Sequence, residues 1–235
     1  MPKHQKRLSA SRVVAIPKKS RYWMTAPSPG PHPAGRSLPL LTAVRDRLKL
    51  CDTAKEARAI IGDREVMVDQ RVSRDYKRPV GLMDVLSVPK IKGHYRVLVD
   101  RKGRLQLSRI DEKDASWKLV RIEGKTTIRG GKTQLNLHDG RNIIVEKGSY
   151  KTGDTLKIEL PSQKVLAHHP LAKGATAMVI GGSHTGTLAP VSHRIVKTGS
   201  SEDLIELEGG LRTVRSHVFV VGGTKAEVTI PEVIV

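Results

Sequence analysis

Residues 41–72 read LTAVRDRLKLCDTAKEARAIIGDREVMVDQRV, and here the chain changes from a proline-rich tail to regular elements. Apolar side chains recur every three or four residues from Leu41 to Cys51, which predicts an amphipathic helix. Thr53 then offers an N-cap for a second helix, which Gly62 would end as the C′ residue. The stretch therefore predicts two consecutive short helices.

A hairpin is predicted to follow the second helix. Val66–Val68 forms one short strand, and a second strand opens at Val72. The turn between them is Asp69-Gln70. Because glutamine is uncommon at positive φ, the sequence leaves the geometry of this turn open.

The composition of the whole chain limits the functional classes to which the protein can belong. The 235 residues carry a net charge of +19, and aromatic residues make up only 3%. A single cysteine, Cys51, excludes a disulfide framework and any zinc cluster built on cysteines. No apolar run approaches the roughly 20 residues of a membrane span. We expect an intracellular, soluble protein whose partner is a polyanion.

Positive charge is concentrated at the amino terminus. Nine Lys or Arg residues precede the first acidic residue, Asp46. The prolines between Pro27 and Pro39 disfavour both helix and sheet, so residues 1–42 are predicted to be an extended basic arm that orders on its target. Trp23 has two interpretations that the sequence does not separate. It would stack on unpaired bases, or it would anchor the arm to the body.

The segment from 43 to 90 resembles the S-four-type RNA-binding module of ribosomal proteins and RNA-modifying enzymes. The resemblance is carried by Arg47-Leu48, Thr53, Glu56-Ala57-Arg58, Val66-x-Val68 and Val72. It implies that the two helices present a basic face to structured RNA. The residues at the corresponding positions are Arg47, Lys55, Arg58 and Arg64.

Beyond Pro89 the pattern is that of strands separated by turns. Glycine and Asp-Gly pairs punctuate short alternating or apolar runs, which predicts an all-β region over 91–172 shaped as a small barrel or curled sheet. His138–Arg141 is the strongest hairpin signal. The predicted strands are Tyr95–Val99, Arg104–Ser108, Trp117–Ile128, Thr133–His138, Arg141–Val145, Thr155–Leu160 and Lys164–His168.

The last segment, 173–235, resembles the KOW motif of ribosomal proteins and transcription factors. The resemblance rests on Gly174-x-x-Ala177-x-Val179-Ile180-Gly181-Gly182-x-His184-x-Gly186, with Ala189 near a usual glycine position. It implies a strand–loop–strand element whose glycines let the backbone approach a phosphate. Further strands make an SH3-like barrel the expected fold: Leu204–Leu207, Leu211–Val214, His217–Val221 and Ala226–Ile230.

The order of the four segments resembles the S-four-e family of small-subunit ribosomal proteins. The expected fold is α+β and multi-module: basic arm, S-four-like module, central all-β domain and KOW barrel. The resemblance implies a structural constituent of the cytoplasmic ribosome that binds small-subunit ribosomal RNA, supports assembly and contacts neighbouring ribosomal proteins, with no membrane and no small-molecule substrate. The candidate RNA-binding residues are Lys3, Lys6, Arg7, Arg12, Lys18, Lys19, Arg21, Trp23, Arg36, Arg45, Arg47, Lys49, Lys55, Arg58, Arg64, Lys173, His184 and Arg194.

The alternative is an RNA-modifying or RNA-processing enzyme, or a transcription-linked KOW factor. Gly130-Gly131-Lys132-Thr133 lacks the glycine five positions earlier that a phosphate-binding loop requires. The catalytic Gly-Arg-Leu-Asp motif of pseudouridine synthases would coincide with Gly103-Arg104-Leu105, but Gln106 follows. We therefore expect no catalytic residue, no metal site and no cofactor.

Overall fold

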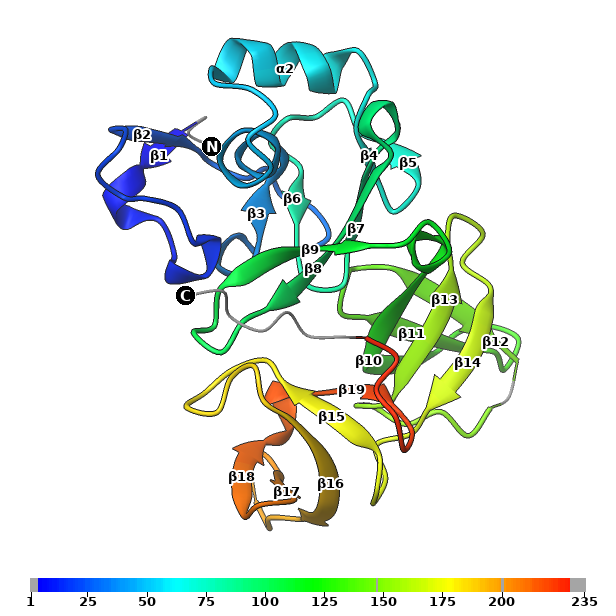
Figure 1. Ribbon diagram of the computed structural model, residues 1–235. Coiled ribbons are helices and arrows are strands. Elements are labelled where there is room, and N and C mark those ends of the chain that lie inside the picture. The colour runs from blue at the N-terminus through cyan, green and yellow to red at the C-terminus, as the bar shows by residue number, and fades with distance from the viewer. Residues whose placement is uncertain (1–3, 147, 200, 229–235) are drawn as a thin grey trace. The chain divides into compact units, whose positions relative to one another are not determined.

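Short strands make up most of the fold, as the sequence after Pro89 predicts (Figure 1). The computed structural model describes residues 4–146, 148–199 and 201–228. The chain forms two compact units. Unit 1 comprises the residues up to 98 with 104–118 and 160–162, and unit 2 comprises 99–103, 119–159 and the residues from 163 onward.

The amino-terminal segment is folded, so the expectation of an extended arm is wrong for the described residues. Strand β1 (His4–Lys6) pairs antiparallel with β2 (Trp23–Thr25), and Val14 and Met24 are buried. Prolines still keep regular structure short, and single 3₁₀ turns occupy Arg7–Ser9, Arg12–Val14 and Ala34–Arg36.

The first predicted helix is shorter than expected and ends before Cys51. It consists of α1 (Leu40–Thr42) continued by a π-helical turn over Ala43–Arg47. Lys49 has a φ of +54°, which no helical residue adopts, and this backbone reversal ends the helix. Leu40, Leu41 and Val44 are fully buried, so the apolar stripe was identified correctly over the residues that are helical.

The second helix, α2 (Ala54–Gly62), begins where the sequence predicts. The Thr53 hydroxyl accepts a hydrogen bond from the Glu56 amide at 3.2 Å, and the Glu56 carboxylate accepts one from the Thr53 amide at 3.3 Å. This capping box satisfies two amides that the first helical turn leaves without partners. It also holds the pKa of Glu56 below its ordinary value, because the Thr53 hydrogen bonds favour the charged carboxylate.

The end of α2 corrects the assignment of Gly62 as the C′ residue. Gly62 is the last helical residue, and the left-handed position belongs to Arg64, with a φ of +63°. The Arg64 amide bonds to the Ile61 carbonyl at 3.3 Å, and the Glu65 amide bonds to the Ile60 carbonyl at 3.4 Å. This is the Schellman pattern, with arginine where glycine is usual.

The Asp69-Gln70 turn adopts the left-handed conformation at both residues, with φ values of +53° and +58°. Such a pair characterises the type I′ hairpin turn, which normally uses Asn-Gly. Here side-chain bonds support the unusual residues. Asp69 Oδ1 accepts from the Val85 amide at 3.0 Å, and Gln70 Nε2 donates to the Ala115 carbonyl at 3.0 Å.

The two strands of this hairpin belong to the largest sheet of unit 1, which also contains two smaller sheets. A two-stranded sheet joins β3 (Leu38–Pro39) to β6 (Pro79–Val80). A five-stranded sheet has the order β5-β4-β7-β8-β9, from β5 (Arg71–Val72), β4 (Met67–Val68), β7 (Val85–Val88), β8 (Gly93–Val99) and β9 (Leu105–Ile110). Further 3₁₀ turns lie at Pro89–Ile91 and Asp114–Ser116.

Unit 2 contains two five-stranded sheets. The first has the order β12-β11-β10-β13-β14, from β12 (Asn142–Val145), β11 (Thr133–Leu137), β10 (Trp117–Thr127, which starts in unit 1), β13 (Thr155–Glu159) and β14 (Val165–His169). The second has the order β18-β17-β16-β15-β19, from β18 (Leu211–Val214), β17 (Leu204–Leu207), β16 (Leu188–Ile195), β15 (Thr176–Val179) and β19 (Val218–Gly222).

The strand predictions for this region agree closely with the structure. Leu137 and Arg141 close the predicted hairpin with a 2.9 Å backbone bond, and Gly140 has a φ of +73°. Ala189 pairs with Ala177 in a regular antiparallel register, so that position needs no glycine. The strand expected at Ala226–Ile230 lies partly outside the described residues, and within them Ala226 forms a single bridge to Gly222.

Candidate nucleic-acid interface

Helix α2 presents exposed basic side chains to solvent. Lys55 and Arg58 on the helix and Arg64 just after its end are all exposed, while Ala57 and Ile61 of the helix are buried. This division follows from helical periodicity, because residues three or four apart share a face. The candidates taken from the S-four resemblance are thus accessible on this helix, whereas Arg47 is half-buried and donates to the Ala15 carbonyl at 3.2 Å.

A basic loop that the sequence analysis missed lies beside this helix. The guanidinium carbon of Arg58 is 4.8 Å from the centroid of the Tyr76 ring, and Lys77 Nζ is 5.7 Å from it. Tyr76 thereby holds two cations from separate elements near one ring. The signal was present as a run of basic residues from the start of β5 to the residue before β6: Arg71, Arg74, Lys77 and Arg78.

Two candidates are interior side chains. Arg7 is 1% exposed, and its guanidinium donates to the Pro17 carbonyl at 2.7 Å and to Asp46 at 3.3 Å. Arg45 is also buried and donates to the other Asp46 oxygen at 2.8 Å. Asp46, the first acidic residue of the chain, therefore pairs with both arginines and fastens the folded amino-terminal segment.

The other described candidates of this segment are more accessible. Lys18 is half-buried, and its ammonium donates to the Ala10 carbonyl at 2.9 Å. Arg21 is exposed and donates to the Asp52 carbonyl at 2.7 Å, just before α2 begins. Lys3 lies outside the described residues. The remaining candidates are exposed: Lys6, Arg12, Lys19, Trp23, Arg36 and Lys49.

The loop between β15 and β16 is shaped by glycine. Gly182 and Gly186 have φ values of +85° and +78°. A Cβ on Gly186 would lie 2.6 Å from the backbone of Asp100 and Arg101, so only glycine fits at this approach. Lys173 before β15 is exposed, and His184 within the loop is half-buried.

Arg194 on β16 has a partner inside the chain. Its guanidinium pairs with Asp203, and the side-chain hydrogen bond holds the pKa of that carboxyl below its ordinary value. Both groups are partly open to solvent, so water screens the pair. Arg194 is therefore less available to a polyanion than the exposed cations of α2.

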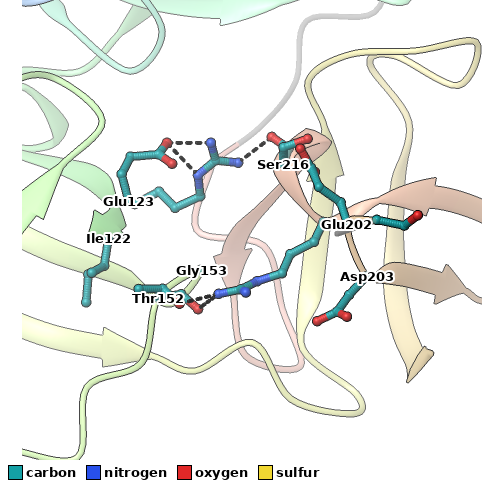
Figure 2. A pocket seen from close by; sticks show the side chains of 10 residues that line it. Ile122, Glu123, Thr152, Gly153, Glu202, Asp203 and Ser216 are labelled. Carbon is teal, nitrogen blue, oxygen red and sulfur yellow. Dashed lines mark hydrogen bonds and ion pairs between the residues drawn. The ribbon is translucent and has the colours of Figure 1, made fainter. Parts of the chain in front are cut away.

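Unit 2 contains a cavity of about 360 Å³ lined mostly by polar residues of strand β10 and of the loops and turn around it (Figure 2). Arg121 donates to the Ser216 and Val218 carbonyls at 2.7 and 2.9 Å and also to Glu123, while Arg215 donates to Thr152. Glu202 and Asp203 line the same space. Because both guanidinium groups already serve protein oxygens, the cavity resembles a junction between loops rather than an anion site.

Other functional classes would need a catalytic aspartate, a set of metal ligands or a membrane-spanning helix. Gln106, where a pseudouridine synthase would carry its aspartate, accepts a hydrogen bond from Arg47. Across residues 4–146, 148–199 and 201–228, no three His, Cys, Asp or Glu side chains are grouped as ligands for a metal ion. In the described part of the chain, no helix has the length and apolar character needed to cross a membrane.

Comparisons with known proteins agree with the resemblance drawn from the sequence. Family models match at two places: the Ribosomal family S4e model covers residues 91–165, and the RS4NT domain covers residues 1–35. Two proteins named small ribosomal subunit protein eS4 align with almost the whole chain. The protein of Methanothermobacter thermautotrophicus is 42% identical over 97% of this chain and 96% of its own length. That of Archaeoglobus fulgidus is 45% identical over 93% of each.

A solved structure shares the fold. The crystal structure of the 30S ribosomal protein S4e from Thermoplasma acidophilum superposes with a TM-score of 0.71 at 33% identity, covering 80% of this chain and 95% of that one. A β-rich, multi-domain architecture is common to both, in agreement with the expected class. With relatives above 40% identity over nearly its full length, this chain belongs to the S4e family of small-subunit ribosomal proteins, the S-four-e family that its sequence resembles.

Proposed function

We propose that this protein is a structural constituent of the small ribosomal subunit and binds ribosomal RNA by phosphate and shape contacts. The observation that carries this proposal is the distribution of charge. Residues 1–45 contain no acidic residue, and most of the cationic side chains described there are exposed. Cations that no internal carboxylate neutralises repel one another unless a polyanion lies against them.

The proposed RNA surface of unit 1 has two parts. The first is the exposed set in the amino-terminal segment: Lys6, Arg12, Lys19, Arg21 and Arg36. The second is α2 with the adjacent loop: Lys55, Arg58, Arg64, Arg74 and Lys77. Arg7 and Arg45 support this surface from inside, because they fix the segment that carries the first set.

In unit 2 the β15–β16 loop is the proposed contact. Its glycine Gly186 lies close to the backbone of Asp100 and Arg101, His184 lies within the loop, and the exposed Lys173 precedes β15. The proposed modules are the four segments of the sequence analysis, with limits at 42, 90 and 172: the basic amino-terminal segment, an S-four-like module, a central all-β domain and a KOW barrel. Phosphate contacts fix position rather than sequence, and helical RNA is recognised mainly by its shape.

This arrangement explains how such a protein supports assembly without catalysis. RNA segments packed in a particle repel through their phosphates, and lysine and arginine side chains between them lower that repulsion. Neighbouring ribosomal proteins would meet the surfaces that RNA leaves uncovered.

The test is the salt dependence of binding to a small-subunit ribosomal RNA transcript. If about ten phosphates are neutralised, log affinity falls against log salt with a slope of about −7 or steeper. Replacing Lys6, Arg12, Lys19 and Arg36 with Gln should make the slope shallower by about three units. A matched variant replaces Lys102, Lys113, Arg129 and Lys225, which are also exposed but lie elsewhere in the chain.

Two results would overturn the proposal. One is a slope shallower than about −2, which would mean that few counterions are released. The other is an equal loss of affinity in the two quadruple variants, which would reduce binding to net charge alone. Co-sedimentation provides a second readout, because a structural constituent remains near stoichiometric with small subunits after a moderate salt wash.

A further inference from the structure

Three aromatic rings gather on the amino-terminal strand pair. The ring centroids of His4 and Trp23 are 4.6 Å apart, and those of Tyr22 and Trp23 are 4.9 Å apart, both pairs edge to face. Trp23 is 49% exposed and Tyr22 is 65% exposed. Edge-to-face packing does not cover the rings as parallel stacking would, so part of this aromatic cluster (His4, Tyr22 and Trp23) stays open to a planar ligand.

The geometry of β2 separates the two interpretations that the sequence left for Trp23. Successive side chains of a strand point to opposite faces. Met24 points inward and is 2% exposed, so it anchors β2 to unit 1, and Trp23 must point outward. Burial of Trp23 is therefore not what fastens the segment. About half of the apolar Trp23 surface is in contact with water, which is unfavourable. A partner stacked on the ring would remove this surface from water.

The charges around the cluster favour one kind of partner. Lys6 pairs with Trp23 across the two strands, and its ammonium lies 5.9 Å from the Tyr22 centroid. Arg21 is exposed beside them and donates to the Asp52 carbonyl just before α2, and Lys55 in the first turn of α2 is also exposed. No acidic residue precedes Asp46, so the segment that carries the rings contributes only positive charge around them.

We propose that the aromatic cluster is a stacking platform for an unpaired RNA base, with Lys6 and Arg21 on the adjacent phosphates. In single-stranded RNA a flat base lies a few ångströms from a negatively charged phosphate. The aromatic rings can stack on the base, and the neighbouring cations can bind the phosphate. This inference rests on the proposed function and deepens it, because it assigns one contact to a base rather than to the backbone.

Trp23 itself provides the probe. The only other tryptophan, Trp117, is buried with the Arg96 guanidinium 4.0 Å above its ring, and Trp117→Phe keeps an aromatic ring there. In the Trp117→Phe protein, all tryptophan fluorescence comes from Trp23. We expect a 12-nucleotide unstructured RNA to quench it at saturation, and a blunt 12-base-pair RNA duplex and poly-glutamate to leave it nearly unchanged.

Affinities complete the test. With Trp117 retained as a reporter of folding, Trp23→Leu should weaken binding of the unstructured RNA about tenfold and binding of the duplex less than twofold. Trp23→Phe should recover part of the loss. Leu8→Ala is the matched control, because Leu8 is 65% exposed in the same segment, and its affinity should be unchanged.

The outcomes separate this inference from the proposed function. Equal quenching by duplex or poly-glutamate, or an unchanged affinity in Trp23→Leu, overturns the stacking platform. If salt-dependent binding to ribosomal RNA persists in those cases, the proposed function stands. If neither RNA binds in a salt-dependent manner, the proposed function itself fails.

Discussion

The ammonium nitrogen of Lys118 lies 2.8 Å from Oδ2 of Asp69 in the interior of unit 1. The same nitrogen donates to Oδ1 of Asp84 at 3.1 Å, and the Lys118 side chain is 0% exposed. His32 contacts the other Asp84 oxygen at 2.9 Å. This buried network joins the start of β10 to the left-handed hairpin turn and to the proline-rich segment.

Replacing Lys118 with Met should destabilise the protein by about 3–5 kcal/mol, because two buried carboxylates would lose their shared cation. The free energy of unfolding in urea at neutral pH measures this. Lys113→Met changes an exposed lysine nearby and should cost less than about 0.5 kcal/mol. A Lys118→Met protein as stable as the control would show that the network contributes nothing net.

Low pH should destabilise unit 1, because protonation removes the negative charge of Asp84. Burial raises the pKa of this carboxyl, but Lys118, His32 and the Gly81 amide outweigh burial and hold the pKa well below its ordinary value of 3.8. A depressed folded-state pKa means that the stabilisation is complete above the unfolded-state pKa and is lost as pH falls below it.

Unfolding free energies measured from pH 6 to pH 2 should therefore fall steeply below about pH 4 in the native sequence. In Asp84→Asn the fall should be shallower, although the protein is less stable at pH 6. Asp63→Asn, at an exposed site, should retain the native slope. Parallel curves for the native and Asp84→Asn proteins would exclude Asp84 as a cause of acid sensitivity.

Gly186 should tolerate alanine far less well than Gly174. Both have positive φ, +78° and +83°, which costs an alanine about 1 kcal/mol. Only at Gly186 would the new Cβ also meet backbone, at 2.6 Å, whereas nothing lies within 4 Å at Gly174. We expect a total cost of about 3 kcal/mol for Gly186→Ala. Equal unfolding free energies for the two variants would contradict the close approach.

Arg7 and Arg12 should respond differently to replacement by Gln. Arg7→Gln removes a buried cation from Asp46 and should speed amide hydrogen exchange in β1 and β2. Arg12→Gln alters an exposed side chain, so exchange should stay as in the native protein while the salt slope of RNA binding becomes about one unit shallower. The reverse pattern would mean that Arg7, not Arg12, faces RNA.

Local patterns predicted the strands and the start of α2 because their determinants lie close together in the chain. Thr53 and Glu56 are three residues apart, and the hairpin at Gly140 needs only its own turn residues. The exposure of Lys55 and Arg58 likewise follows from the period of one helix.

Local sequence patterns could not predict contacts between residues that are far apart in the chain. Asp46 binds Arg7 from 39 residues away, so the amino-terminal segment looked like an unpartnered charged arm. Lys118 lies on a strand, and a lysine on a strand normally faces water. Its burial is explained by its two carboxylate partners, Asp69 and Asp84, which are far from it in the sequence. The Tyr76 site was missed because Arg58 and Lys77 come from separate elements.

The pairing of β19 with β15 has a consequence for the order in which the protein is made. Among the described residues β19 is the last strand, yet it lies at the edge of the carboxy-terminal sheet next to β15, the first strand of that sheet. Until residue 222 has been synthesised, β15 presents an unpaired edge with the apolar residues Ala177, Met178 and Val179. Translation that stops before Val218 would therefore release chains prone to edge-to-edge aggregation, which gives this protein a built-in dependence on complete synthesis.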